Sequence, residues 1–266
     1  MARIGAALID IDGVLTVSWR PLPGAVDALT RLRAAGLPFA LLTNTTARTR
    51  ASIANALAEA GFPVGSEDIL TAPAVTAARL AEQHPGARCL LLNCGDISAD
   101  LAGVRLVEAD TREEVEVVLV GGAGACADFD YPALNRAFGH LQRGARLVAM
   151  HRNLYWRTDQ GLQLDSGAFL LGLERATGTR AEVVGKPAGA FFATALAHLG
   201  AEPDRTVMVG DDVESDVLAA QRVGITGVLV RTGKYREQAV RDADGTPDHV
   251  IDSVADLPDL LAGLPA

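Results

Sequence analysis

Five aspartates stand in two groups, each placed just after a short apolar run. Asp10 and Asp12 follow the run AALI. Asp211, Asp212 and Asp216 follow the run TVMV. A strand buried on both faces of a parallel sheet is continuously apolar, and open α/β sheets bind ligands outside the carboxyl ends of such strands. Crowded carboxylates need a neutralising cation, and an all-oxygen ligand set suits Mg²⁺. The pattern predicts a site for metal-assisted phosphoryl transfer.

Strands and helices alternate along both ends of the chain, which predicts a parallel sheet covered by helices. We expect buried strands at 6–9, 37–42, 206–209 and 226–230, and helices near 25–35, 189–199 and 214–222. The polar run TNTT, from Thr43 to Thr46, follows the second strand, and its side chains are expected to cap a helix that begins near Ala47. Free N–H groups at a helix start bind anions, so this segment is a candidate phosphate seat.

A second α/β pattern interrupts the first. It predicts strands at 88–92, 115–120 and 145–149, and helices near 72–83, 131–143 and 167–177. The length of 266 residues also favours two domains. We therefore predict a core formed by residues 1–75 and 182–266, with an inserted α/β cap domain at 76–181.

Composition argues against several classes of protein. The net charge is −9 and no basic cluster is visible, so neither nucleic acid nor an anionic membrane surface is an expected partner. No apolar run reaches the roughly 18 residues of a membrane span, and the amino terminus does not resemble a signal peptide. The three cysteines are odd in number and lack metal-ligand spacing. We expect no disulfide framework, no zinc site and a cytoplasmic location.

Lysine is rare in this chain. Lys186 and Lys234 are the two lysines among 24 basic residues, and the others are arginines. The ammonium group is compact where the guanidinium is a planar fork, so a retained lysine can indicate a site that needs a point charge. Chance is the alternative explanation for each lysine taken alone.

Four segments together resemble a known family. They are LIDIDGVL from Leu8, LTN from Leu42, VGKP from Val184 and VGDDVESD from Val209. In this order they resemble the four motifs of haloacid dehalogenase (HAD) superfamily phosphatases. The long insertion between the second and third motifs is similar to the large α/β cap of the NagD-like subfamily. Within it the chain resembles hydrolases of the phospholysine phosphohistidine inorganic pyrophosphate phosphatase type, as does the segment VRTGKY from Val230.

The resemblance implies a Rossmann-like parallel-sheet core and a role for each acidic residue of the first motif. Asp10 would be the nucleophile that forms an aspartyl-phosphate, which divides one difficult displacement into two easier steps. Asp12 would protonate the leaving oxygen and later deprotonate water, with its proton retained through crowding by other carboxylates.

The resemblance also implies the remaining contacts of the site. Gly13, Thr43 and Asn44 would contact the phosphoryl group, and Lys186 would neutralise its charge. Mg²⁺ would lie between Asp10, the main-chain carbonyl of Asp12, and Asp211. Asp216 would orient Lys186 or metal-bound water from behind.

Each motif taken alone also has an ordinary structural explanation. An Asp-Gly pair is a common turn, and Thr43 with Asn44 can simply cap a helix. The segment GKP can be a loop with a solvated lysine, and acidic residues are favoured at any helix start. The occurrence of all four motifs in order, each at a strand end or loop, favours the functional interpretation.

The insertion carries a segment of mixed chemistry. HRNLYW, from His151 to Trp156, combines an imidazole, a cation and two aromatic rings, and departs from the more usual Thr-Asn-x-Asp pattern of the family. It either contacts the leaving group of the substrate or belongs to packing and loop surface. Trp19, just after the first motif, either belongs to a flap that shields the site from water or is buried against the cap.

These observations predict a cytoplasmic, Mg²⁺-dependent phosphatase for a small phosphorylated metabolite. The alternatives are a phosphotransferase or mutase on the same site, a dehalogenase, and a sensor without catalysis. A dehalogenase needs the first aspartate but no metal, so Asp12 and Asp211 argue against it. A homo-oligomer through the cap is a further expectation, because relatives of this type pair there. The substrate itself is left open.

Overall fold

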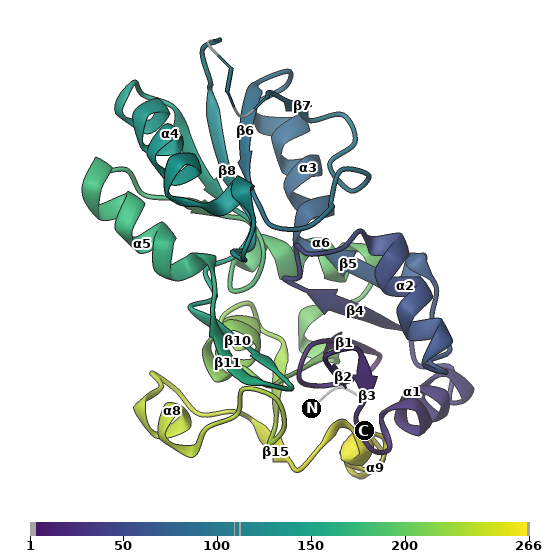
Figure 1. The fold of residues 1–266 in the computed structure, drawn as a ribbon. Coiled ribbons are helices and arrows are strands. Elements are labelled where there is room, and N and C mark those ends of the chain that lie inside the picture. Colours follow the sequence, from purple (N-terminus) through teal and green to yellow (C-terminus); the bar gives the residue numbers. More distant parts are fainter. Residues whose placement is uncertain (1–3, 109, 112, 265–266) are drawn as a thin grey trace.

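Two parallel sheets with helices on their faces make up the structure (Figure 1). This computed structural model describes residues 4–108, 110–111 and 113–264. The larger sheet has the strand order β15 (His249–Ile251), β14 (Thr226–Val230), β13 (Thr206–Gly210), β1 (Ala6–Asp10), β4 (Phe39–Thr43) and β5 (Ile69–Thr71). Its neighbouring strands pair in parallel, and the apolar runs of the sequence form its centre, as predicted.

Helices cover both faces of the six-stranded sheet, and together they form the part we call the core. They are α1 (Ala25–Ala34), α2 (Arg50–Glu59), α6 (Gly189–Leu199), α7 (Ala219–Gln221), α8 (Glu237–Asp242) and α9 (Leu257–Gly263). On one face, Leu29, Ile53 and Leu257 bring α1, α2 and α9 into a single apolar cluster. On the other face, Phe191 and Phe192 of α6 are fully buried. Both faces of the sheet are covered by apolar packing, so its carboxyl edge is the place left for ligand binding.

The smaller sheet forms a separate unit above the core in Figure 1, which we call the cap. Its strand order is β12 (Glu182–Val183), β9 (Arg146–Ala149), β8 (Val117–Val120), β6 (Arg88–Leu92) and β7 (Arg105–Leu106), again parallel. It also has α4 (Tyr131–Gln142), α5 (Ser166–Thr177) and the hairpin β10 (Tyr155–Thr158) to β11 (Gly161–Leu164). Helix α3 (Ala72–Gln83) connects it to β5. The α/β fold with an inserted α/β cap is thus confirmed.

An apolar cluster runs from the core into the cap without interruption. It includes Leu8 and Met208 of the core sheet, Leu119 and Met150 of the cap, and Phe191 of α6. Because the two units share this cluster, the cap is seated on the core over a packed interface. The boundaries at 76 and 182 stay a prediction, and strand β12 at the second boundary pairs with the cap sheet.

Helix α2 begins at Arg50, so the prediction of a start near Ala47 was wrong. Thr49 caps the helix by accepting a hydrogen bond from the N–H of Ser52 at 3.2 Å. The preceding residues leave the helical path, and the side chain of Thr45 instead donates to a carboxylate of the first motif. The run TNTT therefore does not cap a helix, and the predicted phosphate seat at a helix start is absent there.

The helix expected near 214–222 is interrupted. Residues Val213–Leu218 form a π-helical turn, and only Ala219–Gln221 is α-helical. Asp212 holds the start of the turn, because its Oδ1 accepts from the N–H groups of Glu214 and Ser215. Such wide turns are frequent at functional sites.

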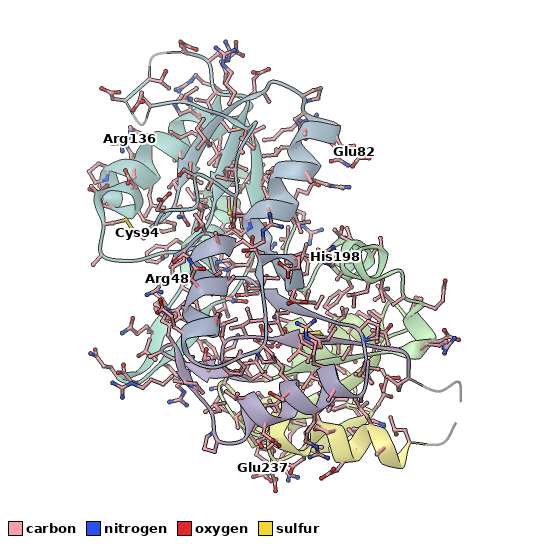
Figure 2. The ribbon with its side chains drawn as sticks, turned by 90° about the vertical axis from the view of Figure 1, so that its right-hand side faces the viewer. Arg48, Glu82, Cys94, Arg136, His198 and Glu237 are labelled. Atoms are coloured by element: carbon pink, nitrogen blue, oxygen red, sulfur yellow. A yellow bond between two sulfur atoms is a disulfide. The ribbon has the colours of Figure 1, made fainter. Side chains whose placement is uncertain are left out.

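Cys94 and Cys126 form a disulfide within the cap, so the expectation of no disulfide was wrong for this pair. The two residues are 32 positions apart, and only the fold brings them together. Cys89 is free and buried. Figure 2 labels Cys94 on the side of the cap that faces Arg48 of the core. Among the described residues, no helix is both long and apolar enough to cross a membrane.

Candidate active site

The predicted site residues meet at the carboxyl edge of the core sheet. Strand β1 lies between β13 and β4, and Asp10 is in register with Leu42 of β4. Asp10 ends β1, Thr43 ends β4, and Asp211 follows β13 directly. Three neighbouring parallel strands thus deliver polar side chains to one place, as the sequence predicts.

A buried lysine links two of the carboxylates. The Nζ of Lys186 is 2.7 Å from Asp10 Oδ1 and 2.7 Å from Asp216 Oδ1. The N–H of Ile11 also donates to Asp10 Oδ1 at 2.9 Å. All three charged side chains are buried, so their ion pairs are little screened by water.

Burial shifts the protonation of this trio. It raises the pKa of the Asp10 carboxyl, against the opposing charge of Lys186. It raises the pKa of Asp216 to about 6, again against Lys186. Burial alone would lower the pKa of Lys186, but the two carboxylates raise it above its ordinary value. The lysine therefore supplies a fixed positive charge beside the nucleophile candidate.

Asp12 has a different environment from the one expected. Its Oδ2 accepts from the hydroxyls of Thr43 at 3.1 Å and Thr45 at 2.7 Å, and it is only half-buried. The charge of Asp12 contributes to the raised pKa of Asp10, and the role of Asp12 as proton donor stays a prediction. Thr45 was not predicted to take part, because the polar run to which it belongs was interpreted as a helix cap.

Asn44 lines the cavity and bonds to Lys186 through its side-chain amide. Its Nδ2 donates to the carbonyl of Lys186 at 2.9 Å, and its Oδ1 accepts from the N–H of Lys186 at 3.0 Å. Both ends of the amide are occupied in this pair of buried hydrogen bonds. The structure thus places Asn44 as a positioning residue for Lys186.

The carboxylate of Asp211 is held on one side and open on the other. Its Oδ2 accepts from the N–H of Lys234 at 2.7 Å, and a Cβ at Gly13 or Gly233 would collide with the same oxygen. Both glycines have positive φ, 86° and 59°. The other oxygen, Oδ1, is buried and without a hydrogen-bond partner. Gly13 borders the cavity. Because it has no side chain, it leaves the space that the Asp211 carboxylate occupies.

Three carboxylates fit a divalent cation. Asp10, Asp211 and Asp216 each offer an oxygen, and these atoms lie within 4.8 Å of one another. Burial, opposed by Lys234 and reinforced by Asp10, raises the pKa of Asp211 well above its ordinary range. A metal cation that prefers oxygen ligands would relieve that repulsion and bind the open Oδ1. The cluster contains Asp216, whereas the side chain of Asp12 stands outside it.

Both lysines of the chain are in this site. Lys234 donates from Nζ to Asp212 Oδ2 at 3.0 Å, in addition to its main-chain bond to Asp211. Burial would lower the pKa of Lys234, but Asp212 and Asp211 raise it above its ordinary value. The motifs gave Lys234 no role, yet the scarcity of lysine was a signal for it.

Comparisons with known proteins agree on the family. The haloacid dehalogenase-like hydrolase family model matches residues 7–106, and a HAD-hydrolase-like model matches residues 183–257. Haloacid dehalogenase-like hydrolase domain-containing protein 2 of Bos taurus is 38% identical over 231 residues, which are 87% of this chain and 85% of that protein. Phospholysine phosphohistidine inorganic pyrophosphate phosphatase of Xenopus laevis is 36% identical over 266 residues, covering 97% and 94%. The chain belongs to the haloacid dehalogenase-like hydrolases.

Solved structures place this hydrolase among the NagD-like members. The p-nitrophenyl phosphatase from Archaeoglobus fulgidus superposes with a TM-score of 0.87 at 27% identity, covering 97% of this chain and 100% of that one. NagD from E. coli K-12 gives 0.82 at 28% identity, covering 96% and 98%. Core and cap are both within these matches, so the predicted NagD-like HAD phosphatase is confirmed as the class of enzyme.

The cavity of this HAD phosphatase lies between the core and the cap. The core wall carries Asp10, Asp211 and Lys186, among other charged groups. The cap wall carries His151 and Trp156 together with two charged residues, Arg157 and Asp165. The segment HRNLYW thus contributes to the cavity, whereas the sequence alone favoured packing and loop surface.

Proposed function

We propose that the protein hydrolyses a small phosphorylated metabolite with Mg²⁺ through an aspartyl-phosphate on Asp10. The observation that carries the proposal is the arrangement of Asp10, with one oxygen fixed by Lys186 and Ile11, beside the open oxygen of Asp211. A bound Mg²⁺ would be held by Asp10 and Asp211, and would supply charge neutralisation between the nucleophile and the phosphoryl group.

Asp10 would attack through Oδ2, because the described hydrogen bonds and ion pair of this carboxylate all use Oδ1. A bond forms between Oδ2 and phosphorus while the bond from phosphorus to the leaving oxygen breaks. Lys186 stabilises the negative charge of the transferring group through its buried ammonium. Asn44 keeps the main chain of this lysine in place, so the charge needs no rearrangement during the step.

Asp12 would serve as the general acid and then the general base. It gives its proton to the leaving oxygen, and in the second step it takes one from the water that attacks phosphorus and releases Asp10. The hydroxyls of Thr43 and Thr45 fix its carboxyl group at the cavity, which supports this assignment. We infer that Thr43, Gly13 and the main chain of Asn44 border the phosphoryl oxygens.

The relatives suggest which substrates to test first. Their names are phospholysine phosphohistidine inorganic pyrophosphate phosphatase and p-nitrophenyl phosphatase. We propose that a small phosphate compound of this kind is the substrate here. Transfer to a second substrate is the alternative reaction, because the same phospho-enzyme serves both outcomes. A sensor without catalysis is disfavoured by the retention of Asp10, Asp12, Lys186 and Asp211.

Three further properties are proposed with this function. The domain division into 1–75, 76–181 and 182–266 follows the insertion pattern. A homo-oligomer through the cap is supported by exposed apolar side chains there, such as Tyr131 and Leu164. The third is the cytoplasmic location, and the redox state of the Cys94–Cys126 pair in cells tests it, since disulfides are rare in reducing compartments.

The deciding experiment is phosphate release from a panel of phosphorylated metabolites, with Mg²⁺ and with chelator. Asp10→Asn is the test variant, and Asp128→Asn, at an exposed position of the cap, is the matched control. We expect Mg²⁺-dependent release by the parent and the control, and none by Asp10→Asn. Full activity of Asp10→Asn would refute the proposal. Phosphate found on a second compound, rather than free, would favour the transferase.

A further inference from the structure

The mechanism uses the core wall of the cavity and leaves the cap wall without a role. His151 and Trp156 come from the cap, and Trp19 comes from the core loop between β2 (Thr16–Val17) and β3 (Arg20–Pro21). The sequence contains two tryptophans, and both line this cavity. Large aromatic side chains at a cavity are typical of ligand contact.

His151 presents a defined hydrogen-bonding atom. It follows strand β9 closely and is 2% exposed. The N–H of Asn153 donates to its Nδ1 at 3.3 Å, so Nδ1 is an acceptor and Nε2 carries the proton of the neutral ring. Burial lowers the pKa of this imidazole, which keeps it neutral at physiological pH. None of the described hydrogen bonds uses Nε2, so its N–H is the donor left for the cavity.

The acidic neighbour of His151 does not use this donor. Asp165 Oδ2 is 4.0 Å from Nδ1, too far for a hydrogen bond. Asp165 is itself held in place, because its Oδ1 accepts from the N–H of Ser166 at 2.7 Å. The partner of His151 Nε2–H is therefore an acceptor atom of the ligand.

Contacts between the cap hairpin and the core fix the position of Trp156. Arg236 donates to the hydroxyl of Tyr155 at 2.6 Å and lies over its ring at 5.2 Å. Arg157 Nε donates to the carbonyl of Gly233 at 3.3 Å. Figure 1 shows this hairpin, β10 to β11, extending from the cap towards the core. Trp156 is nevertheless 43% exposed, so its ring is positioned without being buried.

Trp19 is held from the core side. Its main chain is in the left-handed region, with φ of 63°, which is unusual for a side chain of this size. The guanidinium of Arg48 lies 4.6 Å from the centre of its ring. A strained position that is retained at a cavity indicates a functional constraint.

We propose that His151, Trp156 and Trp19 form a leaving-group subsite for a flat group that carries a hydrogen-bond acceptor. The proposal rests on the phosphatase function proposed above and adds a substrate class to it. The indole rings contact the faces of the leaving group, and the Nε2–H of His151 donates to its acceptor. Core residues hold the phosphoryl group, so the two contacts act on opposite ends of one substrate.

The test measures binding by the catalytically impaired Asp10→Asn protein, followed by tryptophan fluorescence. The ligands are benzyl phosphate, cyclohexylmethyl phosphate and the three isomers of pyridinylmethyl phosphate, above neutral pH where the pyridine ring is uncharged. Benzyl phosphate is expected to bind about fivefold more tightly than the cyclohexyl compound, because only the former has a flat π face. One pyridinyl isomer is expected to bind about tenfold more tightly than benzyl phosphate.

Variants assign each preference to a residue. His151→Phe should abolish the pyridinyl preference and leave benzyl phosphate binding unchanged, whereas His151→Gln, which keeps an N–H donor, should restore part of the preference. Trp156→Leu should abolish the benzyl preference. Leu162→Ala, on the same hairpin and exposed, is the matched control and should change neither ratio. A structural role for His151 would predict equal losses for all ligands.

Two results would overturn the subsite: equal binding of all five compounds, or preferences that survive in His151→Phe and Trp156→Leu. Absence of any binding by Asp10→Asn also counts against it. Phosphate release by the parent protein from the same compounds is scored separately. Release without preference refutes the subsite alone, and binding with preference but without release refutes the proposed phosphatase activity.

Discussion

The core wall and the cap wall of the cavity hold their polar groups in different ways. On the core wall, Lys186 lies between the buried carboxylates Asp10 and Asp216. On the cap wall, burial lowers the pKa of His151, and Trp156 presents an aromatic side chain to the cavity. The groups of the core wall act on any phosphoryl group, whereas those of the cap wall distinguish what is attached to it. Changes to the core wall should therefore lower kcat, and changes to the cap wall should alter KM and substrate preference.

The largest effect is expected at Lys186. Lys186→Met removes the cation that faces the transferring group and leaves two buried carboxylates without their partner. We expect kcat to fall by about 10²–10³ or more, measured in steady-state assays on a folded protein verified by circular dichroism. Arg241→Met, at an exposed cation paired with Glu237, is the control and should keep full activity. A loss below tenfold would contradict the division between the walls.

Stabilisation of the fold by Mg²⁺ tests whether the open oxygen of Asp211 binds the metal. Mg²⁺ at about a hundred times its Kd should stabilise the parent by about 2.7 kcal/mol, because a ligand that binds only the folded state adds its binding energy to folding. Asp211→Asn should lose most of this gain, and Asp128→Asn should keep it. Thermal unfolding with and without Mg²⁺ measures both. An equal gain in all three proteins would place the metal elsewhere.

Substitution of two glycines allows the cost of a steric collision to be compared with the cost of ordinary backbone strain. Gly13 and Gly36 both have positive φ, 86° and 68°, but only at Gly13 would a Cβ meet Asp211. Gly36→Ala should cost about 1 kcal/mol in unfolding free energy. Gly13→Ala should cost clearly more and also abolish Mg²⁺ stabilisation. Chemical denaturation of both variants gives the comparison, and equal costs would show that Gly13 does not fix Asp211.

A smaller effect is expected on the cap side. Tyr155→Phe removes the hydroxyl that accepts from Arg236, so the hairpin that carries Trp156 loses one contact with the core. We expect KM to rise about two- to fivefold with kcat nearly unchanged, since one hydrogen bond to a charged donor is lost. Steady-state kinetics on the best substrate of the panel measures both constants. A fall in kcat without a change in KM would mean that the hairpin affects the chemical step, as the core wall is expected to do.

The smallest effect concerns stability of the cap. Arg152 contacts Glu174 at 2.5 Å, and Glu174 also accepts from the N–H of Ala181. Burial would raise the pKa of Glu174, but these contacts lower it. Its contribution is therefore complete above the unfolded pKa of about 4.3 and is lost as pH falls through the lower folded value. Glu174→Gln should cost about 1 kcal/mol at neutral pH and less in acid.

The control for this variant is Glu237→Gln, in an exposed pair with Arg241 on α8. It should change the free energy of unfolding by at most a few tenths of a kcal/mol at either pH. Denaturation curves at neutral and acidic pH decide the matter. A pH-independent cost at Glu174 would mean that packing, and not charge, stabilises this part of the cap.

Sequence predicted the fold well because the signals are local. Buried parallel strands are continuous apolar runs, and their carboxyl ends share one edge, so Asp10, Thr43 and Asp211 could be placed together in advance. The scarcity of lysine singled out Lys186 and Lys234, and both lie in the site. Composition thus carried information that the motifs alone did not for Lys234.

What sequence missed depends on contacts between distant segments. The run TNTT looks like a helix cap, but Thr45 contacts Asp12 across the sheet edge, so α2 starts later. The side-chain amide of Asn44 hydrogen-bonds to Lys186, which is 142 residues away in the sequence. Cys94 finds Cys126 only after the cap has folded. Each of these outcomes needs the relative position of two loops, which periodicity does not encode.

Two successive main-chain amides beside the buried lysine bond to different units of the molecule. The N–H of Gly185 donates to Met150 of the cap at 2.9 Å, and the N–H of the next residue, Lys186, donates to Asn44 of the core. The two donors are consecutive residues of the chain. A rotation of the cap that breaks either bond would expose that amide to solvent, where faster deuterium exchange would report it. The position of the cap and the main chain of Lys186 are therefore tied together by these two bonds.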